Sequence, residues 1–118
     1  MNSTVAEKPQ HLSALESANR VRLARTERKR QIAALTYADG KDQVAAMICD
    51  PPDLWLTASL EYVLRMPQRA GWSFVARMCR GAGVSQDRRL GSLTVRQRLA
   101  LANQVSASVV HEFVRENF

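Results

Sequence analysis

The sequence predicts an all-α protein, a small helical bundle of about five helices, and three observations support this. Apolar residues recur at helical spacing in runs that lack Gly and Pro. Sustained alternation of apolar and polar residues, which is typical of strands, is missing from the sequence. The 118 residues suffice for one compact domain that folds without disulfides or metals. We expect a flexible lead over residues 1–10 and a single helical domain over residues 11–118.

The first predicted helix is the longest and runs from about His11 to Leu35. One stripe along it is apolar and consists of Ala14, Val21, Ala24, Ile32 and Leu35. A second stripe is basic, because Arg22, Arg25 and Lys29 recur at i, i+3 and i+7. Residues 20–30 carry six positive charges and one negative charge. This excess favours contact with an anionic partner over a merely solvated face.

Two shorter helices are predicted next. We expect Asp39-Gly40 to end the first helix and Asp42 to cap a helix that runs to Cys49. A further helix is expected over Thr57–Met66, where Pro67 stops it. The apolar residues just before this helix are core candidates, namely Leu54, Trp55 and Leu56.

The next predicted helix spans about Trp72 to Arg80, and Gly81 and Gly83 end it with the positive φ that a helix C-cap requires. Trp72, Val75 and Cys79 share one face, so we expect Trp72 to pack in the core. The alternative for this side chain is a wedge between bases, as in minor-groove architectural proteins.

One long final helix is predicted from Val95 to about Glu116, and Thr94-x-x-Gln97 before it has the spacing of a capping box. The apolar stripe near its end contains Val109, Val110, Phe113 and Val114. This stripe either folds back on the bundle or forms a contact with a second copy or another protein.

Several classes of protein are excluded by what the sequence lacks. Cys49 and Cys79 are too few for a disulfide framework or a four-ligand zinc site and are expected to be reduced, buried thiols. No apolar run suits a signal peptide or a membrane span, so we expect a cytoplasmic protein. His11 and His111 are isolated, and no phosphate-binding glycine loop is present, so we expect no catalysis, no metal and no cofactor.

The charge balance indicates a phosphate-rich partner. Lys and Arg total 17 against 11 acidic residues, and 14 of the 17 are arginines. Residues 65–98 hold eight arginines and only one acid, Asp87. Several of these arginines stand at turns or helix starts, where free N–H groups also attract anions.

Two segments resemble a known family. The runs Leu60–Gly71 and Gly83–Arg98 are similar to the helix-two-turns-helix module of the actinobacterial integration host factor, which would span about residues 57–104 here. The long first helix is also similar to that of this family, and the resemblance is to the family as a whole, phage-encoded members included. The chain departs from the family pattern at Trp72, where lysines usually follow the turn glycine, and at Gly91, which replaces a basic residue.

The resemblance implies a nucleoid-associated protein that binds double-stranded DNA through backbone phosphates, with little sequence preference, and bends or compacts it. It implies that Gly71 lets the backbone approach phosphates and that Arg88 and Arg89 contact DNA. With the charge pattern, the predicted DNA-binding residues are Arg22, Arg25, Lys29, Arg69, Gly71, Arg77, Arg88, Arg89, Arg96 and Arg98. The alternatives are RNA binding through the same basic edge, or a protein-interaction module, for example from a phage, that grips a host partner.

Overall fold

The computed structural model describes residues 10–118, and the regular structure in this range is entirely helical. The predicted lead over residues 1–10 lies outside the described residues except for Gln10, where α2 begins. The elements in chain order are α2 (Gln10–Ala33), α3 (Tyr37–Cys49), the 3-10 turn η1 (Asp53–Trp55), α4 (Leu60–Leu64), α5 (Trp72–Ala82), the 3-10 turn η2 (Leu90–Ser92), α6 (Val95–Val105) and α7 (Ala107–Asn117). The predicted all-α fold is confirmed.

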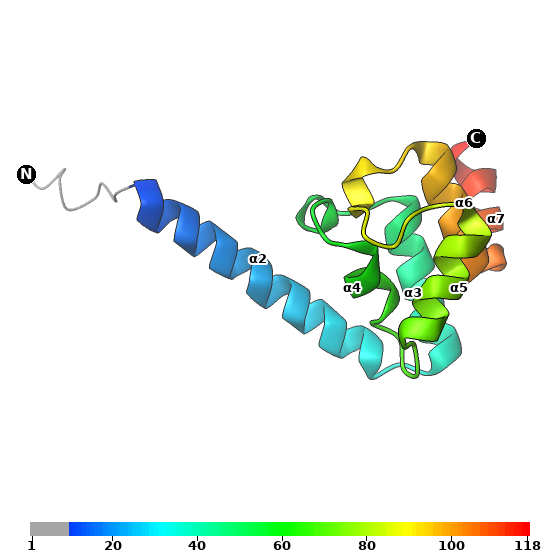
Figure 1. Ribbon diagram of the computed structural model, residues 1–118, viewed down its shortest axis with the longest axis horizontal. Helices are drawn as coiled ribbons and strands as arrows, with labels where there is room; N and C mark the ends of the chain where they lie inside the picture. The colour runs from blue at the N-terminus through cyan, green and yellow to red at the C-terminus, as the bar shows by residue number, and fades with distance from the viewer. Residues whose placement is uncertain (1–9) are drawn as a thin grey trace, which may run out of the picture.

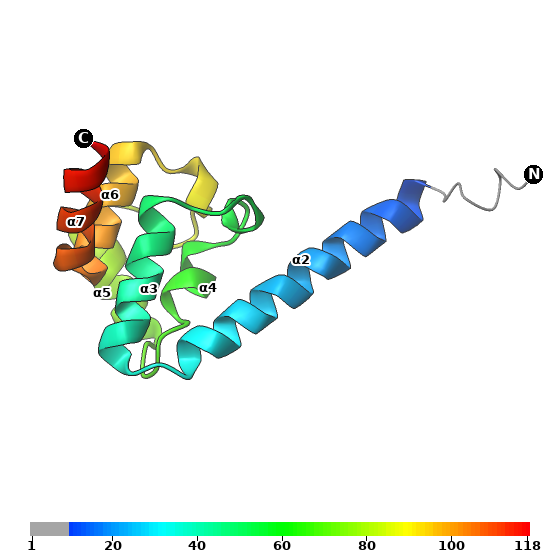
Figure 2. The same ribbon diagram turned by 180° about the vertical axis from the view of Figure 1, so that it is seen from behind.

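Helices α3 to α7 form the bundle, and α2 projects away from it (Figures 1 and 2). Helix α3 packs against α6 and α7, and α5 packs against both α4 and α6. The core between them is made of fully buried side chains, including Ile48, Leu64, Val75 and Leu101. At about 25 cal/mol per Å² of apolar surface, this burial is the main stabilising term of the fold.

Helix α2 touches the bundle only through its C-terminal part. Ile32 is fully buried, whereas residues 13–20 are all exposed. The predicted apolar stripe is therefore a contact surface only in its later residues, and Ala14 lies in solvent. Arg28 supports the contact by donating a 2.8 Å hydrogen bond to Oε1 of Gln43 on α3. At 1.5 Å per residue the helix is about 36 Å long, so much of it stands free.

The prediction that Asp39-Gly40 ends the first helix is wrong. Helix α2 ends at Ala33, and α3 begins at Tyr37, with the hydroxyl of Thr36 accepting from the N–H of Asp39 as its N-cap. Gly40 lies buried inside α3. A Cβ there would stand 3.2 Å from Cβ of Pro67. The glycine serves close packing between segments, which a local turn signal does not reveal.

The single final helix predicted from Val95 is also wrong, because the chain breaks at Ser106. Its backbone is extended, with φ −155° and ψ 99°, and its hydroxyl donates a 2.8 Å hydrogen bond to Asp42 on α3. Helix α7 therefore turns back and packs against α3 and α6, and Val110 is buried in the core. The bundle itself uses most of this apolar stripe, with Val109 and Phe113 partly buried against the core, whereas Val114 is exposed. The Thr94 capping box is confirmed.

Helix α4 is shorter than the Thr57–Met66 helix expected from the sequence. The backbone before it pairs with the loop before η2. The N–H of Leu60 donates to the carbonyl of Arg88 at 3.0 Å, and that of Leu90 donates to Ala58 at 2.9 Å. These bonds accompany an isolated bridge between Ser59 and Arg89 that holds Ser59 extended, so the helix starts only after it. Of the predicted core residues before α4, only Trp55 is buried; Leu54 and Leu56 are exposed.

Both thiols are free and buried, as expected. Burial raises the pKa of Cys49 and of Cys79, which disfavours the reactive thiolate. Within residues 10–118, no helix is both long enough and apolar enough to cross a membrane.

Candidate nucleic-acid interface

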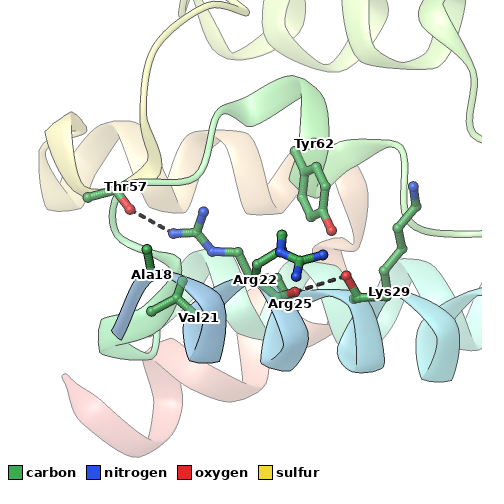
Figure 3. A pocket seen from close by; sticks show the side chains of 8 residues that line it. Ala18, Val21, Arg22, Arg25, Lys29, Thr57 and Tyr62 are labelled. Atoms are coloured by element: carbon green, nitrogen blue, oxygen red, sulfur yellow. Dashed lines mark hydrogen bonds between the residues drawn. The ribbon is translucent and has the colours of Figure 1, made fainter. Parts of the chain in front are cut away.

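A groove of about 730 Å³ opens between α2 and the segment that contains Thr57 and α4 (Figure 3). Three cations from α2 line one wall, and Thr57 and Tyr62 line the other. We call this site the basic groove; its lining residues are Ala18, Val21, Arg22, Arg25, Thr26, Lys29, Thr57 and Tyr62. This lining contains no carboxylate. The structure thus brings the predicted basic stripe of the first helix to a concave surface.

Arg25 joins α2 to the bundle at the end of this groove. Its guanidinium donates to the carbonyl oxygen of Leu54 at 2.6 Å and to the hydroxyl of Thr57 at 2.7 Å. The same group lies over the ring of Trp55, 5.7 Å from the centroid. All of these partners are uncharged, so Arg25 fixes the position of α2 while its positive charge is retained.

Arg22 and Lys29 extend along α2 on either side of Arg25. The ammonium of Lys29 lies over the Tyr62 ring, 5.4 Å from its centroid. Arg22 donates a hydrogen bond to the side-chain oxygen of Asn19 one turn earlier. Both cations are exposed. Their charges can therefore reach a ligand in the groove without breaking the packing of the protein.

Arg89 reaches the same place from the loop before η2. Its Nη1 donates a 2.7 Å hydrogen bond to the carbonyl oxygen of Thr57, whose hydroxyl is held by Arg25. Arg88, its neighbour, instead donates to the carbonyl of Ser92 at 2.6 Å. Of the predicted arginine pair, therefore, Arg89 lies beside the basic groove and Arg88 stabilises the loop. Sequence reasoning missed Thr57, since a single threonine before a helix carries no special signal.

The turn between α4 and α5 holds Arg69 and Gly71, which were expected to contact phosphates. Arg69 is exposed and adopts the left-handed conformation, with φ 64°. Gly71 has φ −108° and precedes the first turn of α5 as its N-cap. Gly71 is therefore not a turn glycine with positive φ; Arg69 holds the left-handed position of this turn. A Cβ on Gly71 would meet nothing within 4 Å, so the backbone there is open to a ligand.

Trp72 does not pack in the core, contrary to the prediction. Its side chain is 56% exposed, and the guanidinium of Arg65 lies over its ring, 4.4 Å from the centroid. Phe74 fills the core at this end of α5 and makes an edge-to-face contact with Tyr37 at 6.1 Å. The expectation that Val75 and Cys79 are buried is confirmed.

The remaining predicted residues lie away from the groove. Arg77 is exposed on α5, and α3 and α4 separate most of that helix from α2 (Figures 1 and 2). Arg96 is exposed in the first turn of α6. Arg98 is half-buried, and its Nη1 lies 3.5 Å from the carbonyl of Leu93. Arg98 therefore borders the core, which leaves Arg96 as the more accessible of these two cations.

Within the described part of the chain, no carboxylate forms an ion pair with a predicted DNA-binding residue. Arg30 pairs with Glu27 and Arg115 pairs with Glu112, both at 2.7 Å, and neither pair includes a predicted DNA-binding residue. The Arg30 hydrogen bond lowers the pKa of the Glu27 carboxyl, so this pair is charged at neutral pH. The single acid within residues 20–30 thus pairs with Arg30 and not with a cation that lines the basic groove.

The left-handed backbone of Arg69 gives a prediction that distinguishes its effect on stability from the effect of the Arg69 charge on DNA binding. Arg69→Gly and Arg69→Ala remove the same charge, but only glycine adopts φ 64° without a Cβ penalty. We expect the glycine variant to be more stable than the alanine variant by about 1 kcal/mol in urea unfolding. Both should bind DNA more weakly than the parent and to the same extent. Equal stabilities would contradict the turn geometry.

Comparisons of the chain with protein-family models, with curated proteins and with solved structures found no match. The resemblance to the integration host factor family therefore stays a prediction from sequence.

Proposed function

We propose that this protein binds double-stranded DNA through its backbone phosphates, largely without sequence specificity, as an integration-host-factor-like, nucleoid-associated protein. The observation that carries the proposal is the basic groove. Arg22, Arg25 and Lys29 line it, Arg89 lies beside it, and no carboxylate pairs with any of these four within residues 10–118. Unpaired cations gathered in this way bind phosphates and release the counterions of the duplex.

The shape of the protein supports a duplex as the ligand. The basic stretch of α2, residues 20–30, extends over about 16 Å of helix. A duplex presents about ten phosphates over that length. The turn before α5, with Arg69 and the open backbone of Gly71, offers a second contact surface. Bending or compaction of DNA belongs to the same proposal, because two surfaces on one bundle can hold two points of one duplex.

The proposal is tested by measuring the affinity of the protein for nucleic acids by fluorescence anisotropy at several salt concentrations. A labelled duplex, its scrambled sequence and an RNA hairpin of equal length should be compared. We expect the two duplexes to bind within about threefold of each other, since phosphate contacts carry no sequence information. The logarithm of the affinity should fall linearly with the logarithm of the salt concentration, with a slope of about 0.9 per phosphate neutralised. Tighter binding of the hairpin, or affinities insensitive to salt, would contradict the proposal.

A further inference from the structure

Beyond the cation–aromatic contacts of the basic groove lies a further pair of a cation and an aromatic ring, Arg65 and Trp72, which the phosphate contacts proposed above do not use. Tyr62 and Arg65 are three residues apart on α4 and its C-cap and so lie on one side of that helix. Lys29 covers the ring of Tyr62, and Arg65 covers that of Trp72. Cation–aromatic contacts therefore occur both at the groove and at the first turn of α5.

Trp72 is the accessible aromatic of this series. Trp55 is only 4% exposed, and the Tyr62 ring packs against it with centroids 5.8 Å apart. Trp72 has 56% of its surface in solvent, and Arg65 stacks on its ring and orients it. Phe74 rather than Trp72 fills the core at this end of α5. Packing of the core therefore does not require a tryptophan at position 72.

The charges around Trp72 indicate which ligand the indole suits. Arg65 and Arg69 are both exposed, and within residues 10–118 neither side chain hydrogen-bonds or pairs with an acid. Arg65 lies over the Trp72 ring, and Arg69 stands three residues earlier in the turn that leads into α5. An exposed aromatic ring with cations nearby in this way suits a nucleobase and its adjacent phosphates. In an intact duplex both faces of every base are already stacked, so a base meets Trp72 face to face only when it leaves the stack.

We propose that Trp72, with Arg65 over its ring and Arg69 in the preceding turn, stacks on an unpaired nucleobase, so that the protein prefers DNA with an unstacked base over a fully paired duplex. This inference rests on the proposed DNA binding and names the DNA structure that the site selects. Stacking on an aromatic ring tolerates any base, so the preference is for a distortion and not for a sequence.

Affinity measurements on two duplexes test the inference. One is fully paired, and the other has the same sequence with one bulged adenine. We expect the parent protein to bind the bulged duplex about 5- to 100-fold more tightly, the range of one base stacked on an aromatic side chain. Trp72→Ala should abolish this preference and leave affinity for the paired duplex within about twofold, while Trp72→Phe should keep part of the preference. Phe118→Ala, which removes another exposed aromatic side chain, should change neither value.

Tryptophan fluorescence gives a second readout that is independent of affinity. Because Trp55 is buried, the difference between the parent and Trp72→Phe reports on the indole of Trp72. The bulged duplex should quench this signal, and the paired duplex should leave it nearly unchanged. Equal affinity of the parent for the two duplexes, or a preference that survives in Trp72→Ala, would overturn the inference and leave the proposed function standing. Absence of binding to both duplexes would overturn the two together.

Discussion

Replacing Arg22 and Lys29 together by glutamine is expected to weaken binding to duplex DNA about 10- to 100-fold and to lower the salt slope by about 2. Both cations line the basic groove, are exposed and have no carboxylate partner within residues 10–118. Arg25 is kept in this variant because its hydrogen bonds to Leu54 and Thr57 hold α2 in place. Anisotropy at several salt concentrations measures both quantities.

A matched control distinguishes the effect of where the removed charges lie from the effect of how many charges are removed. Arg30→Gln with Arg115→Gln removes the same two positive charges, but each of these arginines pairs with a glutamate. We expect this control to lose less affinity than the groove variant, because neither arginine lines the basic groove and its effect comes only through the net charge and the freed glutamates, which salt screens. If the two double variants lost affinity equally, net charge rather than the basic groove would govern binding.

Gly91→Ala is expected to lower the free energy of unfolding by about 1 to 3 kcal/mol and to weaken DNA binding as well. A Cβ at this position would lie 2.8 Å from the carbonyl oxygen of Leu56, to which the N–H of Gly91 donates at 2.7 Å. The loop must move away from residues 56–60, and Arg89 then leaves Thr57. Urea unfolding and anisotropy measure the two effects.

The same substitution at Gly81 serves as the control. The Cβ would meet only the side chain of Gln104, which is exposed and can turn away. Alanine also favours the helix by about 0.5 to 1 kcal/mol over glycine, so Gly81→Ala should be at least as stable as the parent. Unchanged stability of Gly91→Ala would contradict the close approach of the two segments. This approach also accounts for a small residue at position 91.

The fold could be predicted as far as local patterns determine it. Helical periodicity and capping signals located α2, α5 and the start of α6 to within a few residues. The helix break at Ser106 and the burial of Gly40 in α3 could not be predicted, because each depends on a partner far along the chain. Ser106 bonds to Asp42, and Gly40 packs against Pro67.

The candidate site shows the same division between local and long-range information. The spacing of Arg22, Arg25 and Lys29 placed them on one stripe, and the structure has all three in one groove. The position of Arg89 could not be predicted, since its partner is a backbone carbonyl, which any residue type supplies. Trp72 was misplaced because helical spacing shows which residues share a face but not where the core ends.

The free-standing part of α2 makes affinity depend on a helix–coil equilibrium. Residues 13–20 are all exposed, and a short helical extension in water is only marginally stable. Any ligand that requires this segment to be helical must provide the entropy of ordering it. Helix propensity at a solvent-facing position such as Ala14 therefore tunes binding strength without altering a single charge.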